Sequence, residues 1–249
     1  MRAYYPSIQA GLDDARKHFS EQLGIEEISF FELPSEKSIA HRTWCILCSL
    51  LKHRSYSVDW LESKSYRAYA AKVIANNSVQ AVHVDTMALT GMLPKNSFKI
   101  PIIVNHHNAE HHMMYRRATK QKNIIAKIIF FLEARKIEKF DRDSISTATA
   151  NIVCSQADKI RIAELSDADI PIHVIPNGVP YRSETTRAPE KGKLLFVGGL
   201  DWYPNNSAIT QFLSEVWPQL RDSVPNLELD IIGKNPSDRI IGLAESFPE

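Results

Sequence analysis

Several features that would mark a specialised class of protein are scarce or missing in this sequence. Its 249 residues include three cysteines, an odd number that argues against a disulfide framework and suits a reducing compartment. Cys45 and Cys48 stand in an apolar helical pattern without the second pair of a structural zinc site, so we expect buried thiols. Repeats and low-complexity tracts are missing too, and the composition, 44% hydrophobic and 24% charged, is that of a globular protein.

Signals for membrane insertion and for nucleic-acid binding are also missing. The longest apolar runs are far shorter than the ~18 residues that cross a bilayer, and residues 1–6 lack the basic start and apolar core of a signal peptide. The net charge of +1 provides no strong field to attract nucleic acid. We therefore expect a cytoplasmic protein without a nucleic-acid partner, and leave open contact with the inner face of the membrane.

Helical and extended patterns alternate along the chain. Apolar residues recur at helical spacing in 8–23, 38–51, 63–76, 124–145, 155–165 and 209–220. Short apolar runs predict strands at 27–33, 80–84, 100–104, 151–154, 172–175, 194–197 and 227–232. This alternation is typical of an α/β protein with parallel sheets.

A polar stretch with two prolines and no periodicity, residues 180–192, predicts a linker. It divides the chain into an N-terminal domain, residues 1–179, and a second domain, residues 193–249. Because two parallel strands cannot form a stable covered sheet, we expect the second domain to lean on the first or to be incomplete.

The second domain begins with a strand, a glycine turn and a helix. Gly198 and Gly199 follow the strand, and Asp201 and Asn205 are residue types that cap helices. Such a turn directs backbone N–H groups and a positive helix end at one place, which favours a phosphate. Many turns of this kind bind nothing, and Asn205 has capping as its alternative role.

The same run, with its Gly-x-x-Asp-Trp-x-Pro-Asn motif from Gly198 to Asn205, resembles the start of the donor-binding domain in family-four-like glycosyltransferases of the GT-B fold. Other stretches resemble the family in the family's order: 104–110, 132–140, 174–179, 212–220 and 231–236. Several motifs in sequence are far more specific than one. The resemblance covers roughly residues 55 to 249.

This resemblance implies two Rossmann-like domains facing across a cleft, the first for the acceptor and the second for a nucleotide-sugar donor. It implies transfer of a hexosyl-type sugar with retention of configuration to a glycan or lipid-linked acceptor, as in polysaccharide biosynthesis, without a metal or other cofactor. Compared with the family, the first strand and the end of the donor domain are missing. We therefore expect a fragment, a split gene product or a decayed copy, whose activity alone stays open.

The resemblance also implies roles for particular residues. The catalytic candidates are His107, whose neutral imidazole would orient a sugar hydroxyl, and Glu110. The cleft or acceptor candidates are Asn108 and Asn177. The donor candidates are Gly198, Gly199, Asp201 and Asn205, with Lys234 as a substitute for the cations that relatives place on the diphosphate. The plain alternative for the first group is a polar turn in which Asn108 caps a helix.

Readings from other classes stay open beside this one. The pattern His107-x-x-Glu110-His111 fits a zinc peptidase if the segment is helical. The chain also fits a non-catalytic α/β binding or partner module. Segments 38–52 and 123–139 join apolar faces to flanking Lys and Arg, so each fits either a membrane surface or a helix packed on a sheet.

Overall fold

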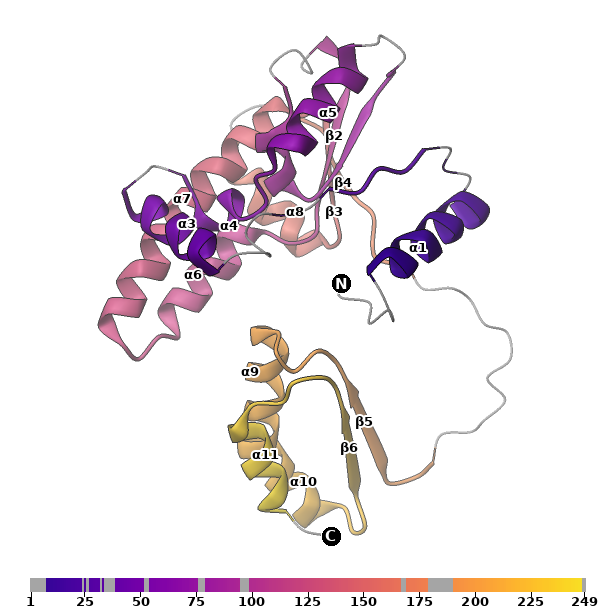
Figure 1. Ribbon diagram of the computed structural model, residues 1–249. Coiled ribbons are helices and arrows are strands. Elements are labelled where there is room, and N and C mark those ends of the chain that lie inside the picture. Colours follow the sequence, from indigo (N-terminus) through magenta and orange to yellow (C-terminus); the bar gives the residue numbers. More distant parts are fainter. Residues whose placement is uncertain are drawn as a thin grey trace. The chain divides into compact units, whose positions relative to one another are not determined.

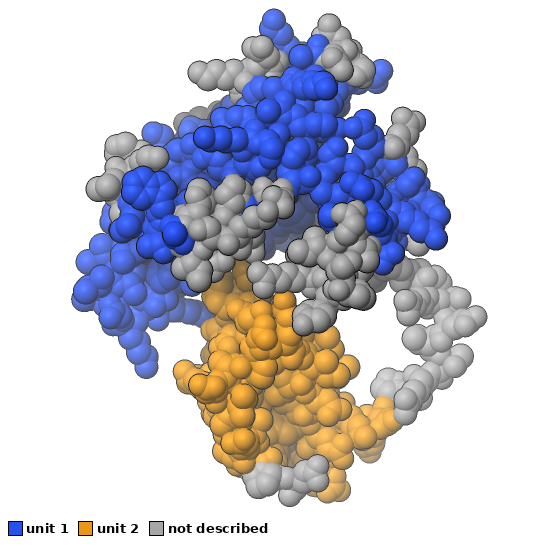
Figure 2. Space-filling model, in the orientation of Figure 1, with its two compact units in different colours: residues 1–179 blue, residues 180–249 orange. Residues whose placement is uncertain are grey.

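The computed structural model describes residues 8–23, 25, 27–31, 33, 39–51, 54–75, 79–94, 99–166, 169–178 and 190–247. The chain divides into two compact units, unit 1 (Met1–Val179) and unit 2 (Pro180–Glu249), which are coloured separately in Figure 2. Most of the predicted linker at 180–192 lies outside the described residues.

Unit 1 is built on a parallel sheet in the order β1-β2-β3-β4 (Figure 1). The strands are β1 (Val82–Asp85), β2 (Ile102–His106), β3 (Ala150–Val153) and β4 (Ile172–Val174). The helical segments are α1 (Ile8–Leu23), α3 (Ile39–Leu51), α4 (Tyr56–Asp59), α5 (Lys64–Ala75), η1 (Met87–Met92), α6 (Glu110–Thr119), α7 (Ile124–Thr147) and α8 (Gln156–Ala163). The helices connect successive parallel strands, so the α/β fold class is confirmed.

The sheet is held by alternate residues that point into a helical layer. In β2, Ile102 and Val104 are buried against Ile137 of α7. The side chain of Asn123 caps α7 by accepting hydrogen bonds from the amides of Ile125 and Ala126. None of the helices in the described part of the chain has both the length and the apolar character that a membrane crossing requires.

The strand predicted at 27–33 is wrong for the residues of that range that the structure describes, none of which is in a strand. An aromatic residue of this range packs on a helix, and the described residues do not pair in a sheet. The ring of Phe31 packs on those of Tyr66 and Tyr69 in α5, with centroids 5.4 and 5.2 Å away. Tyr69 also donates its hydroxyl hydrogen to Glu27, at 2.5 Å.

Unit 2 pairs two parallel strands and covers one of their faces (Figure 1). Its elements are β5 (Lys193–Val197), α9 (Tyr203–Gln211), the π-helical η3 (Phe212–Val216), α10 (Trp217–Ser223), β6 (Glu228–Ile232) and α11 (Asp238–Glu245). Phe196, Leu229 and Ile231 pack on the helical core. The other face exposes apolar residues: Leu195, Val197 and Ile232 are 63%, 68% and 57% exposed. Parallel sheets are normally covered on both faces, so two strands with one cover are a marginal unit, as the sequence indicates.

The carboxyl ends of β5 and β6 approach each other so closely that glycine is required. The amide of Gly198 donates to the carbonyl of Ile232 at 3.0 Å. A Cβ added to Gly233 would collide with the carbonyl oxygen of Gly198 and lie 2.8 Å from Cγ of Leu200. Gly233 therefore permits the junction of the two strand ends.

We expect Gly233→Ala to lower the stability of unit 2 by about 1–3 kcal/mol or more, because the new methyl group overpacks a backbone contact. Gly242→Ala is the matched control. Its Cβ would meet nothing within 4 Å and it lies inside α11, so it should raise stability by about 0.5–1 kcal/mol. Thermal unfolding of both variants measures the difference, and equal melting temperatures would contradict this account.

Candidate functional site

Polar side chains gather at the carboxyl edge of the unit 1 sheet, where ligands bind in open parallel sheets. Asp85 ends β1 and pairs in register with Asn105 of β2. Its Oδ1 accepts a hydrogen bond from Nδ2 of Asn105 at 2.8 Å and lies 3.1 Å from Nε2 of His107. The two side chains therefore meet through Nε2 of the imidazole, and Nδ1 is the other polar atom of the ring.

The residue after Asp85 has an unusual backbone. Thr86 adopts φ 120° and ψ 131°, a region that β-branched residues rarely occupy. A strained backbone conformation of this kind persists only where the surrounding structure enforces it, and such residues are common at functional sites. It marks the end of β1, beside the Asp85–His107 pair, as a constrained part of the edge.

The same edge includes the turn after β4. Sγ of Cys154, which follows β3, donates to Oδ1 of Asn177 at 3.4 Å. The predicted candidates His107 and Asn177 therefore both lie at the carboxyl ends of the strands, and both are exposed. The sequence did not single out Asp85 or Cys154, although each directly follows or ends a predicted strand.

A buried polar layer lies beneath this edge. Nε2 of His106 lies 2.9 Å from Oδ1 of Asn151, and Nδ1 of His111 lies 2.7 Å from Oδ2 of Asp141. All four residues are buried. Sequence reasoning missed the layer. A signal was present, because Asp141 stands four residues from two buried isoleucines of α7, Ile137 and Ile145, on the inward stripe of the helix.

Burial shifts the pKa of one member of this layer, His106, and of Glu110 beside it. Burial lowers the pKa of His106, and its contacts with Asn151 and Asp141 oppose that change only in part. Burial raises the pKa of Glu110, with the negative charge of Asp141 as the next cause, against a hydrogen bond from Asn108. His106 is therefore kept neutral, and Glu110 holds its proton more tightly than an exposed glutamate.

The segment that carries His107 enters α6 without a side-chain cap. The N-cap is Ala109, whose amide lies 3.4 Å from Oδ1 of Asp158, so the alternative in which Asn108 caps the helix is wrong. Because α6 begins at Glu110, His107 lies outside the helix and does not share a helical face with His111. Within the described ranges, no group of three or more His, Cys, Asp or Glu residues is placed to hold a metal.

Several polar groups of the glycine turn in unit 2 are already hydrogen-bonded within the unit. The amide of Leu200 donates to the carbonyl of Lys234 at 3.1 Å, and that of Trp202 to Gly199 at 3.2 Å. Asn205 lies inside α9 and donates Nδ2 to the carbonyl of Gly199 at 3.1 Å, so its predicted N-cap role is wrong. The turn is thus a braced loop that offers fewer free N–H groups than its sequence indicates.

Charged side chains border this turn. Oδ2 of Asp201 lies 3.1 Å from Nδ2 of Asn235 and 3.7 Å from Nζ of Lys234. The hydrogen bond from Asn235, and then the charge of Lys234, lower the pKa of Asp201. A carboxylate here opposes an anionic ligand, and the lysine favours one.

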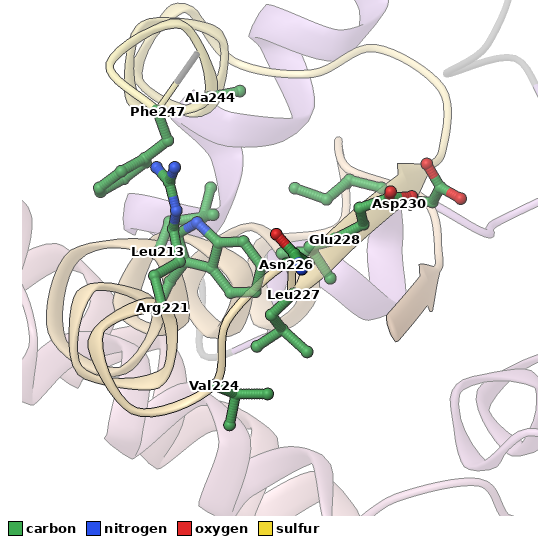
Figure 3. Close-up of a pocket in the computed structure, with 12 residues that line it drawn as sticks. Leu213, Arg221, Val224, Asn226, Leu227, Glu228, Asp230, Ala244 and Phe247 are labelled. Carbon is green, nitrogen blue, oxygen red and sulfur yellow. The ribbon is translucent and has the colours of Figure 1, made fainter. Parts of the chain in front are cut away.

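A pocket of about 590 Å³ in unit 2 lies elsewhere, between β6, α10 and α11 (Figure 3). The guanidinium of Arg221 lies over the ring of Phe247, with Cζ 5.9 Å from the ring centroid. Four consecutive residues of β6, 228–231, line the pocket, which is therefore the space along one edge of that strand. None of the predicted donor residues lines it.

Comparison with known proteins bears on unit 1. A model of the family described as Glycosyltransferase Family 4 matches residues 33–182, more than half of the chain. A search of the curated proteins finds no match. The matched range includes all four strands of the unit 1 sheet and the polar residues at their carboxyl ends.

The neutral His106 predicts a pH-dependent stability. In the unfolded chain this histidine takes up a proton below pH ~6.5, whereas its lowered pKa prevents this in the folded chain, so stability falls as pH falls through 6.5. We expect the wild type to lose on the order of 1 kcal/mol more than His106→Gln between pH 7 and pH 5. Urea unfolding at both pH values measures it. Parallel losses in the two proteins would refute the assignment.

Proposed function

Because this chain belongs to Glycosyltransferase Family 4, we propose that it moves a sugar from a nucleotide-sugar donor to a hydroxyl group of a glycan or lipid-linked acceptor. In the reaction the bond between the anomeric carbon and the diphosphate oxygen breaks. A bond from the acceptor oxygen to that carbon forms, and the proton of the acceptor hydroxyl passes to the departing diphosphate oxygen. We further propose that the reaction retains the anomeric configuration and proceeds without a metal or other cofactor.

His107 is the residue on which the proposal depends most. The observation that supports it is the short distance between Nε2 and Oδ1 of Asp85, 3.1 Å, at the carboxyl edge of a parallel sheet. In this proposal the ring carries its N–H on Nε2, facing Asp85, and Nδ1 accepts a hydrogen bond from a sugar hydroxyl and so positions the anomeric carbon. Asp85 acts as a positioning residue, because it reaches the substrate through His107.

Glu110 and two asparagines complete the proposed acceptor side. The raised pKa of Glu110 favours its protonated form more than in an exposed glutamate, which makes it a donor as well as an acceptor for hydroxyl groups. Asn108 bonds to Glu110, and Asn177 lies at the same edge of the sheet. Amide and carboxyl groups of this kind suit the hydroxyl-rich surface of a sugar.

A separate proposal concerns the turn of unit 2, which we assign to the diphosphate of the donor. Lys234 supplies a cation to this turn, since its carbonyl accepts the Leu200 amide and its Nζ lies near Asp201. Gly198 and Gly199 keep the backbone approachable, and the N-terminus of α9 adds a positive dipole. The assignment depends mainly on Lys234, because several backbone amides of the turn already donate hydrogen bonds inside unit 2.

We expect His107→Ala to lower kcat for sugar transfer by about a hundredfold or more with a smaller change in KM, because a positioned imidazole is lost. His83→Ala is the matched control, an exposed histidine of β1 that stands two residues before Asp85. The measurement is release of nucleoside diphosphate from a panel of nucleotide sugars with glycan and lipid-linked acceptors. Equal activity in the two variants would exclude His107 from the reaction, and inactivity of the wild type across the panel would favour a non-catalytic binding module.

We expect Lys234→Gln to weaken nucleoside diphosphate binding about tenfold, because a charge-assisted contact to phosphate is lost. Lys191→Gln, another exposed lysine of unit 2, should bind as the wild type does. Calorimetric titration with uridine, guanosine, adenosine and thymidine diphosphates measures both. A wild type that binds a diphosphate with the same affinity as Lys234→Gln would place the phosphate away from this turn.

A further inference from the structure

The first turns of α7 expose a continuous apolar surface, here called the hydrophobic arc. Its six large residues are between 43% and 67% exposed: Ile124, Ile125, Ile128, Ile129, Phe131 and Leu132. At about 100° per residue these positions cover one arc of about 160° around the helix. So much adjacent apolar surface on one helix face is uncommon unless something covers it.

The rest of α7 shows that the arc does not belong to the core. The apolar residues of its second half, such as Ile137 and Ile145, are buried against the sheet. In the first half, α7 packs on α6: Arg117 lies over the ring of Phe130 at 4.3 Å from its centroid, and Phe131, at the edge of the arc, packs on the ring of Tyr115 with centroids 5.5 Å apart. Packing on the sheet, the plain expectation for 123–139, therefore holds only for the later part of the helix.

The charges around the arc are of one sign. Residues 111–132 contain no aspartate or glutamate. They contain five basic residues: Arg116, Arg117, Lys120, Lys122 and Lys127. On the arc itself the apolar positions end at Leu132, and the same side of the helix continues with Arg135, Lys136 and Lys139.

The acidic residues that follow Leu132 in α7 accept hydrogen bonds from other groups. Glu133 is buried and accepts hydrogen bonds from the hydroxyl of Ser55 at 2.6 Å and the amide of Ser57 at 3.1 Å. Glu138 accepts the hydroxyl of Tyr115 at 2.5 Å. The segment 111–132 therefore brings lysines and arginines to the apolar end of α7 without a carboxylate of its own.

The neighbouring helix α3 adds to the same side of unit 1. It exposes Trp44, Ile46 and Leu47, at 63%, 44% and 51%. Nζ of Lys136, one turn beyond the arc, donates to the carbonyl of Ser49 near the end of α3. Figure 1 shows α3 beside the hairpin of α6 and α7, whose connecting turn lies away from the sheet.

We propose that this surface binds an anionic lipid membrane, with the hydrophobic arc in the boundary between headgroups and acyl chains and the lysines and arginines at the lipid phosphates. An apolar helix face flanked by basic residues is the pattern of helices that lie in a membrane surface. A protein partner fits less well, because the cores of protein interfaces are depleted in lysine. This inference does not depend on the proposed transferase activity, and its test measures binding alone.

The test is sedimentation with phosphatidylcholine vesicles that contain or lack phosphatidylglycerol, at low and high salt. The wild type should bind the anionic vesicles, bind less at high salt, and bind neutral vesicles weakly. The double variant Ile125→Asp/Ile128→Asp should lower the partition coefficient about tenfold or more. Lys122→Gln/Lys127→Gln should lower it about fivefold per lysine at low salt.

The matched control is Ile160→Asp on α8, because Ile160 and Ile128 are both 54% exposed. It should bind vesicles as the wild type does, and if it loses binding as strongly as the arc variants do, the arc is not the membrane contact. If Ile125→Asp/Ile128→Asp does not fold, Ile124→Asp at the start of the helix replaces it. The proposal is overturned if the wild type does not bind anionic vesicles. It is also overturned, in favour of a protein interface, if the wild type forms dimers in solution that the arc variants dissociate.

Discussion

The two buried contacts that join His106 to Asn151 and His111 to Asp141 fix the part of the fold on which its chemistry depends. They tie the end of β2 to β3 and α6 to α7, so the loop between His106 and His111 is held at both ends. Buried polar groups are costly unless they are satisfied, and Nδ1 of His106 and Oδ1 of Asp141 are buried without a hydrogen-bond partner in the described structure. The geometry therefore depends on the hydrogen bonds that Nε2 of His106 and Oδ2 of Asp141 make. His107 lies in this loop with its Nε2 3.1 Å from Oδ1 of Asp85, and Glu110 begins α6 beside it. The family match covers this whole region of unit 1.

Unit 2 shows a different balance between structure and function. Its glycines first permit two strand ends to meet, since Gly233 accommodates the carbonyl of Gly198. Its asparagine Asn205 braces the turn from inside α9. What remains for a ligand is the cation Lys234 and a short stretch of backbone. A phosphate site here would therefore depend on side-chain charge more than on backbone amides.

Strands with an apolar run bounded by turn residues, such as 100–104 and 151–154, were predictable because burial imposes a local pattern. The α/β class followed from their alternation with helices. The run at 27–33 has the same pattern but packs its ring Phe31 on α5, and no local rule distinguishes a tertiary contact of that kind from sheet pairing. At the site, His107 was recognisable by resemblance. Its partner Asp85 lies 22 positions earlier and is brought near by strand register, which one sequence does not reveal.

The central claim is that the orientated imidazole at the carboxyl edge of the unit 1 sheet contacts a nucleotide sugar. Side-chain NMR of the histidines during titration with nucleotide sugars tests it most directly. The Nδ1 and ring carbon signals of His107 should shift with saturation, while those of His83, an exposed position of β1 two residues before Asp85, should stay in place. Saturable binding that leaves the His107 signals unmoved would contradict the account.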